Sequence, residues 1–137
     1  MFGQAAFEYI VIVGIVMMML IPIWSYLIAV NGQATQSLYI SQAQTAAQKL
    51  TSAAELVYTQ GPPSQITLDV YIPKGLSGSS ILNRTIVFNL YFDNGVTDVV
   101  STTFVPINGS IPSSEGLYKF VVKALPGYAN ISSNISY

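Results

Sequence analysis

The chain has 137 residues, of which 51% are hydrophobic and only 8% are charged. A typical soluble domain carries about 25% charged residues, so this chain lacks the charge for a hydrated surface along its whole length. The net charge of −1 argues against a nucleic-acid-binding protein, and the absence of cysteine and histidine removes the usual thiolate and imidazole groups. We therefore expect no catalytic residues, no bound metal and no cofactor.

The first predicted element is an apolar helix. No charged residue occurs between Glu8 and Lys49, and residues 10–30 are almost entirely apolar. As a helix, these 21 residues would extend about 31 Å, close to the hydrocarbon thickness of a bilayer at about 30 Å. The segment is apolar around its circumference, so lipid or other protein must surround it. The residues expected to make these contacts are Tyr9, Ile10, Val13, Val16, Leu20, Pro22, Trp24 and Leu27.

Two positions are expected to weaken this helix. Pro22 removes one backbone hydrogen bond and predicts a kink or local unwinding. Asn31-Gly32 is a second weak point, because glycine costs about 1 kcal/mol relative to alanine in a helix interior.

The helix is predicted to continue over residues 31–60 as an amphipathic segment. Spacings of three and four place one apolar stripe along it, made of Tyr39, Ala43, Ala46, Leu50, Ala53 and Val57. The opposite face is polar and is predicted to carry Gln42, Gln44, Thr45, Gln48, Lys49, Thr51 and Ser52. Gly61-Pro62-Pro63 then ends the helix. One helix over residues 4–60 follows, apolar over 4–30 and amphipathic over 31–60.

The C-terminal region, residues 61–137, changes to the alternating pattern of β-strands. Alternation predicts strands over residues 66–72, 86–92 and 118–124, and Asp93-Asn94-Gly95 predicts a hairpin turn with a return strand over residues 96–105. A domain of this size is marginal alone, so the helix stripe is expected to complete its core. The fold class is therefore α+β: a long N-terminal helix packed on a small antiparallel β-sheet domain.

Four N-x-S/T triplets lie in the predicted β domain, at Asn83, Asn108, Asn130 and Asn134. N-linked glycans at these positions would hydrate a poorly charged extracellular surface; unmodified polar loops are the alternative. Asn130 and Asn134 follow Pro126-Gly127 in a predicted tail and are expected to be the most accessible.

Residues 3–9 read GQAAFEY and run directly into the apolar helix. This arrangement resembles the class III signal peptide of archaeal type IV pilins. The resemblance implies that residues 1–3 form a leader, that a prepilin peptidase cleaves between Gly3 and Gln4, and that Glu8 is the fifth residue of the mature chain. In such a pilus, Glu8 would offset the free amine of a neighbouring subunit and set the axial register. A simpler role for Glu8 is to complement the helix dipole from the first turn, which is worth about 0.3–1 kcal/mol.

The resemblance implies a structural pilus subunit that serves surface adhesion or cell contact. Residues 4–30 would span the membrane in the precursor and form the core of a helical homopolymer afterwards, with the β domain exposed outside the cell. An assembly ATPase and a membrane platform protein are the further partners that the family implies. Two alternatives stay open: a membrane-anchored surface protein that does not polymerise, and a subunit of an archaellum or a minor pilin.

Overall fold

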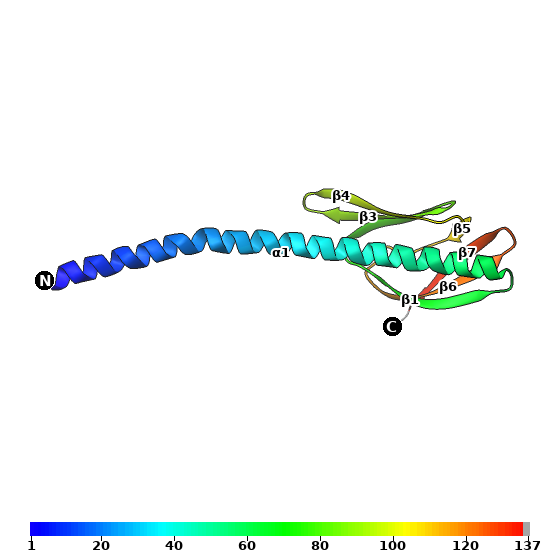
Figure 1. Cartoon of the computed structure of the whole chain (residues 1–137), viewed down its shortest axis with the longest axis horizontal. Helices are drawn as coiled ribbons and strands as arrows, with labels where there is room; N and C mark the ends of the chain where they lie inside the picture. The colour runs from blue at the N-terminus through cyan, green and yellow to red at the C-terminus, as the bar shows by residue number, and fades with distance from the viewer. Residues whose placement is uncertain (136–137) are drawn as a thin grey trace. The chain divides into compact units, whose positions relative to one another are not determined.

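The computed structural model describes residues 1–135 (Figure 1). Over this range one helix, α1 (Phe2–Gln60), precedes seven strands: β1 (Gln65–Ile72), β2 (Leu76–Leu82), β3 (Thr85–Phe92), β4 (Gly95–Thr102), β5 (Ile107–Gly109), β6 (Gly116–Leu125) and β7 (Tyr128–Ile135). The chain divides into an N-terminal unit, Met1–Gln36, and a C-terminal unit, Ser37–Tyr137. The predicted α+β fold, a long N-terminal helix packed on antiparallel β-structure, is confirmed.

Helix α1 continues through both predicted weak points, Pro22 and Asn31-Gly32. The prediction of local unwinding at Pro22 is therefore wrong, because one missing hydrogen bond does not end a helix whose flanking turns remain bonded. The helix also begins at Phe2, two residues before the predicted start. It ends where the sequence predicts: the Gly61 N–H donates to the Val57 carbonyl at 3.0 Å, and the φ of +78° at Gly61 is typical of a glycine C-cap.

The apolar stripe of the second half of α1 is confirmed. Its members from Ala43 onward are buried, and Tyr39 is half-buried against the core. The stripe is wider than predicted, since Ala47 and Ala54 are also fully buried. Placing Thr51 on the polar face was wrong. Its side chain is buried on the side of α1 that faces β4. The hydroxyl remains satisfied there, since it donates to the Ala47 carbonyl at 3.1 Å and lies 3.1 Å from the Ser101 hydroxyl.

The strands form two sheets, one of four strands in the order β1-β6-β7-β5 and one of three strands in the order β2-β3-β4. The three strands predicted over residues 66–72, 86–92 and 118–124 are confirmed as β1, β3 and β6. The predicted hairpin is confirmed as well, with Phe92 paired to Gly95 around the turn residues Asp93 and Asn94. The neighbouring pairs are antiparallel except β5 and β7, which pair in parallel.

Several strand predictions need correction. The return strand ends at Thr102 and not at residue 105, because its partner β3 begins at Thr85, which pairs with Thr102, and offers no further residue to pair with. The predicted tail after Pro126-Gly127 is strand β7, and Pro126-Gly127 is the turn that joins it to β6. Strands β2 and β5 were not predicted at all.

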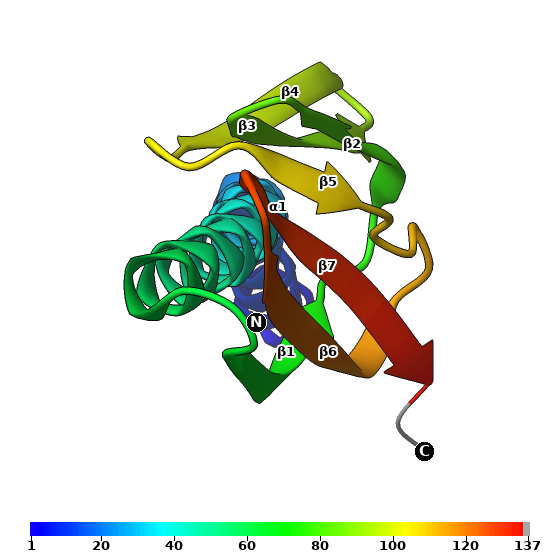
Figure 2. The same cartoon turned by 90° about the vertical axis from the view of Figure 1, so that its right-hand side faces the viewer.

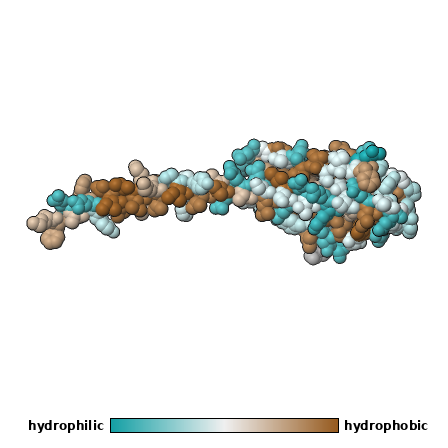
Figure 3. Space-filling model, in the orientation of Figure 1, coloured by the Kyte–Doolittle hydropathy of each residue, from teal (hydrophilic) through white to brown (hydrophobic). Residues whose placement is uncertain are grey.

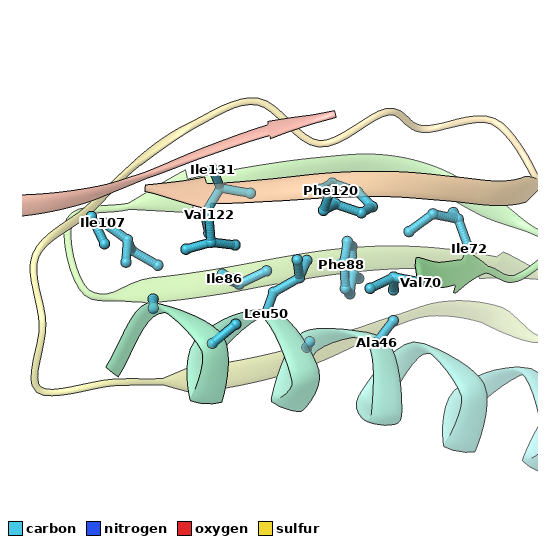
Figure 4. Packing of buried hydrophobic residues seen from close by; sticks show 14 of the residues in the cluster. Ala46, Leu50, Val70, Ile72, Ile86, Phe88, Ile107, Phe120, Val122 and Ile131 are labelled. Atoms are coloured by element: carbon cyan, nitrogen blue, oxygen red, sulfur yellow. The ribbon is translucent and has the colours of Figure 1, made fainter. Parts of the chain in front are cut away.

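The core of the C-terminal unit lies where the two sheets and α1 meet. Figures 1 and 2 both show the part of α1 that belongs to the C-terminal unit, residues 37–60, between the three-stranded sheet and the β1 end of the four-stranded sheet. Leu50 of α1, Phe88 of β3 and Phe120 of β6 are among the largest fully buried side chains, and Figure 4 shows them converging on one another. Each layer thus contributes one large apolar side chain to a shared core.

Candidate functional site: the apolar helix and the surfaces of the C-terminal unit

The apolar part of α1 is the most prominent exposed surface of the N-terminal unit. Among the described residues, α1 is the one helix long and apolar enough to cross a membrane by length and composition, and none of the side chains in that stretch is buried. The hydrophobic colour in Figure 3 covers most of this stretch. Every residue named as a helix contact from the sequence is exposed here: Tyr9, Ile10, Val13, Val16, Leu20, Pro22, Trp24 and Leu27.

Aromatic residues mark both ends of this apolar stretch. Tyr9 stands near its start, and Trp24 and Tyr26 stand near its end, all exposed. Tyr9 and Trp24 are separated by about 22 Å along the helix axis, given a rise of about 1.5 Å per residue. Tyrosine and tryptophan are enriched at the two interfaces of a bilayer. Tyr26 was not singled out from the sequence, although its spacing from Tyr9 could have identified it.

The Ser25 side chain within this stretch is satisfied by the helix itself. The Ser25 hydroxyl donates to the Ile21 carbonyl at 3.1 Å, so it does not need water or another chain. This internal bond lowers the free-energy cost of placing a hydroxyl in an apolar surrounding. The stretch therefore suits contact with lipid or with other apolar helices.

Glu8 is exposed and is the one charged side chain among residues 1–48. Because α1 begins at Phe2, the first helical turn contains no acidic residue. Glu8 therefore lies beyond the first turn of α1, where an acidic side chain would complement the helix dipole. A carboxylate at the edge of an apolar surface is costly to desolvate without a cationic partner. Gly3 and Gln4, which flank the expected cleavage position, lie in the first turns of α1 and are fully accessible.

Three of the four N-x-S/T asparagines lie on one face of the four-stranded sheet. Asn108 of β5 pairs with Asn130 of β7, while Lys123 and Lys119 of β6 pair with Asn130 and Asn134 of β7. Residues that pair directly, or that are two and four apart on a strand, share a face. These five side chains therefore form the polar face of the sheet, on the side away from the core. The sequence identified the asparagines but not their convergence, which depends on strand register.

The accessibility expected for these asparagines is partly corrected. Asn130 is half-buried within β7, so it is not among the most accessible, whereas Asn134 is exposed as expected. The serine of its triplet, Ser136, lies outside the described residues. Asn83 is exposed in the β2–β3 turn with a φ of +54°, and Asn108 is exposed on β5.

A groove that the sequence did not predict runs between α1 and β1 in the C-terminal unit. It consists of two adjoining cavities of about 360 and 390 Å³ that share Thr45 and Lys49 of α1. We call it the α1–β1 groove. Ile66, Leu68 and Val70 line its β1 side, and β1 is an edge strand of its sheet. The polar face of α1 could be predicted, but its proximity to β1 required the tertiary fold.

Two polar groups at one end of the α1–β1 groove have distinct chemistry. The Gln42 Oε1 atom is buried and has no hydrogen-bond donor among the described residues. Across the groove, the Tyr71 hydroxyl donates to the Glu115 carboxylate at 3.1 Å. This hydrogen bond to Glu115 is the main reason that the pKa of Tyr71 is raised, because the bond favours the protonated phenol.

Comparison with known proteins identifies no relative of this chain. The sequence matches no protein-family model and no curated protein, and the structure matches no solved structure. The functional argument therefore rests on the apolar helix, the polar face and the α1–β1 groove.

Proposed function

We propose that this chain is the structural subunit of an extracellular filament, similar to an archaeal type IV pilin. The observation that carries the proposal is the exposed apolar half of α1, which has a membrane-spanning length and no covering layer in the described chain. The C-terminal unit has its own packed core, so it does not need that half of the helix for folding. A chain with these two properties suits a membrane-held precursor whose helix later packs against copies of itself.

The proposed assembly replaces lipid with protein as the surrounding of the apolar helix. The precursor would span the membrane with residues 9–30, with the C-terminal unit outside the cell, and would be cleaved after Gly3. An assembly ATPase and a platform protein would then extract subunits into a helical bundle. Head-to-tail contacts that do not close produce such an open filament. Adhesion or cell contact is the role that we assign to the filament, with glycans on the polar face directed to solvent.

Mass spectrometry of filaments sheared from producing cells tests this proposal. We expect the chain in the filament fraction to begin at Gln4, with hexose-containing mass added at N-x-S/T triplets. Membrane and shear fractions should be measured in parallel. A chain that starts at Met1 and occurs only in the membrane fraction would contradict the filament proposal and favour a membrane-anchored surface protein. A processed chain found in motility filaments would instead identify an archaellum subunit.

Replacing Glu8 with glutamine tests its role in assembly. Because removing one member of a buried ion pair leaves the other charge uncompensated, we expect Glu8→Gln to lower the yield of sheared filaments by about tenfold or more, while the precursor still accumulates in membranes. The yield is measured by immunoblotting of sheared and membrane fractions. Asp69→Asn, which changes an exposed carboxylate of β1 that pairs with Lys119 and does not line the α1–β1 groove, serves as the matched control and should leave the yield unchanged. Equal yields from both variants would exclude an essential register role for Glu8.

A further inference from the structure

The α1–β1 groove lacks two kinds of partner. Its β1 side presents Ile66 and Leu68, which are only half-buried although they face inward in the strand alternation. Lys49, which lines both cavities, is an exposed cationic residue. A complementary surface would therefore supply apolar side chains and a carboxylate.

The β3–β4 hairpin of the same chain presents both chemical features at its tip. The turn residues Asp93 and Asn94 are exposed, and Asp93 offers a carboxylate. Directly behind the turn, Tyr91 and Val96 pair across the strands and are both largely exposed. Aromatic and aliphatic side chains exposed together on one sheet face are typical of a contact surface.

The β3–β4 hairpin does not contact the α1–β1 groove of its own chain. Figures 1 and 2 both place the β3–β4 hairpin and β1 on opposite sides of this part of α1. The flank of α1 toward β4 is also already bonded, through Thr51 to Ser101 and through Glu55 to Thr103. The hairpin can therefore reach this groove on a second copy of the chain but not on its own.

We propose that the α1–β1 groove receives the β3–β4 turn of a second copy, with Asp93 of one copy beside Lys49 of the other and with Tyr91 and Val96 against Ile66 and Leu68. This inference rests on the proposed filament, because it assigns a contact between its subunits. The two surfaces differ, so the contact is heterologous and leaves one groove and one hairpin open at the ends. Such a contact propagates into a filament and does not close into a symmetric dimer.

Cysteine cross-linking of assembled filaments tests this contact. The chain has no cysteine, so a Thr45→Cys, Asn94→Cys double variant provides one thiol in the groove and one at the turn. Mild oxidation of its filaments should give a ladder of covalent oligomers on non-reducing gels, while each single variant should give none of the longer products. A matched pair, Lys119→Cys with Asn94→Cys, places the first thiol on the polar face of the four-stranded sheet, outside every N-x-S/T triplet, and should not give the ladder.

The outcomes separate this inference from the proposed function. Filaments of the Thr45→Cys, Asn94→Cys variant that give no ladder would overturn the groove contact and leave the filament proposal intact. Failure of the unmodified chain to form any filament would instead contradict the filament proposal itself.

Charge reversal provides a second test that does not depend on disulfide geometry. Lys49→Glu and Asp93→Lys should each lower filament yield by about fivefold, in the upper range for an exposed ion pair, and the double reversal should restore most of the loss. Lys123→Glu, which changes an exposed lysine on the polar face, should leave the yield unchanged. Losses that simply add in the double variant would overturn the contact between Lys49 and Asp93.

Discussion

Phe88→Ala is expected to lower the free energy of unfolding of the C-terminal unit by about 3–5 kcal/mol. Phe88 is only 1% exposed and belongs to the cluster that joins α1 to both sheets. Truncation removes most of a buried aromatic side chain and leaves a cavity that Leu50 and Phe120, on the facing layers, fill only partly. Domains of this size have a total stability of about 5–15 kcal/mol, so the variant should lose a large share of it.

Phe104→Ala is the matched control, because Phe104 is the same residue type but is 63% exposed. We expect a change within about 0.5 kcal/mol for this variant. The free energies of unfolding of both variants are measured by urea titration of the detergent-solubilised full chain, with hydrogen exchange of the strand amides as the reporter. The single tryptophan, Trp24, is unsuitable as a reporter since it lies in the N-terminal unit. Equal losses in the two variants would contradict the assigned core.

The sequence predicted the elements whose side-chain periodicity is strong. The stripe from Ala43 to Val57 follows the helical period and is buried as expected. Strand β3 alternates large apolar residues without interruption, and Ile86, Phe88 and Leu90 all point into the core. In both elements, one local pattern predicts both the secondary structure and the buried face. Neither prediction therefore required information on the tertiary fold.

The missed strands carry weak local patterns. Strand β2 reads LSGSSIL and is rich in the serine and glycine residues that usually indicate a loop. Strand β7 contributes the small Ala129 and the larger Ile131 to the core, while Asn130, Ser132 and Asn134 alternate with them as polar residues on the opposite face. Strand β5 has three residues and is stabilised by parallel pairing with β7. These strands form because neighbouring strands supply backbone partners, which no local periodicity reveals.

Some of the candidate functional surfaces could likewise be predicted from the sequence, and others could not. The apolar helix and Glu8 could be identified directly, since the absence of charge over tens of residues is a property of the sequence alone. The polar face could not, because only the register of β5, β6 and β7 brings Asn108, Asn130 and Asn134 together. The α1–β1 groove also required the tertiary arrangement, as its two walls are separated in the chain by the helix end and the Gly61 turn.

Gly109 occupies the second position of the Asn108-Gly109-Ser110 triplet, and the structure gives it a conformational role. Its φ of +137° lies in a region that side chains with a Cβ rarely adopt, and an added Cβ would lie 1.9 Å from the Ile131 carbonyl oxygen. That oxygen belongs to the backbone of β7, which is held by its pairing with β6. The neighbour therefore cannot rotate away as a flexible side chain would.

Gly109→Ala is accordingly expected to destabilise the C-terminal unit by about 3 kcal/mol or more, because the backbone strain adds to a steric clash that displaces β5 from β7. The same urea titration and hydrogen-exchange measurement apply, with protection expected to fall first at the amides of β5 and β7. Gly127→Ala separates the cost of backbone strain from the cost of the steric clash. Gly127 also has a positive φ, +87°, but no atom lies within 4 Å of its added Cβ.

For Gly127→Ala we expect only the conformational cost, about 1–2 kcal/mol. Equal losses in the two alanine variants would mean that β5 moves away from Ile131 at little cost, and would contradict a fixed β5–β7 pairing. The alanine variant at residue 109 keeps an N-x-S triplet, so a glycan lost from Asn108 in that variant would report a change of structure and not of the recognition sequence. A loss of stability with the glycan retained would show that Gly109 is required for the close approach of β5 to β7, independently of modification.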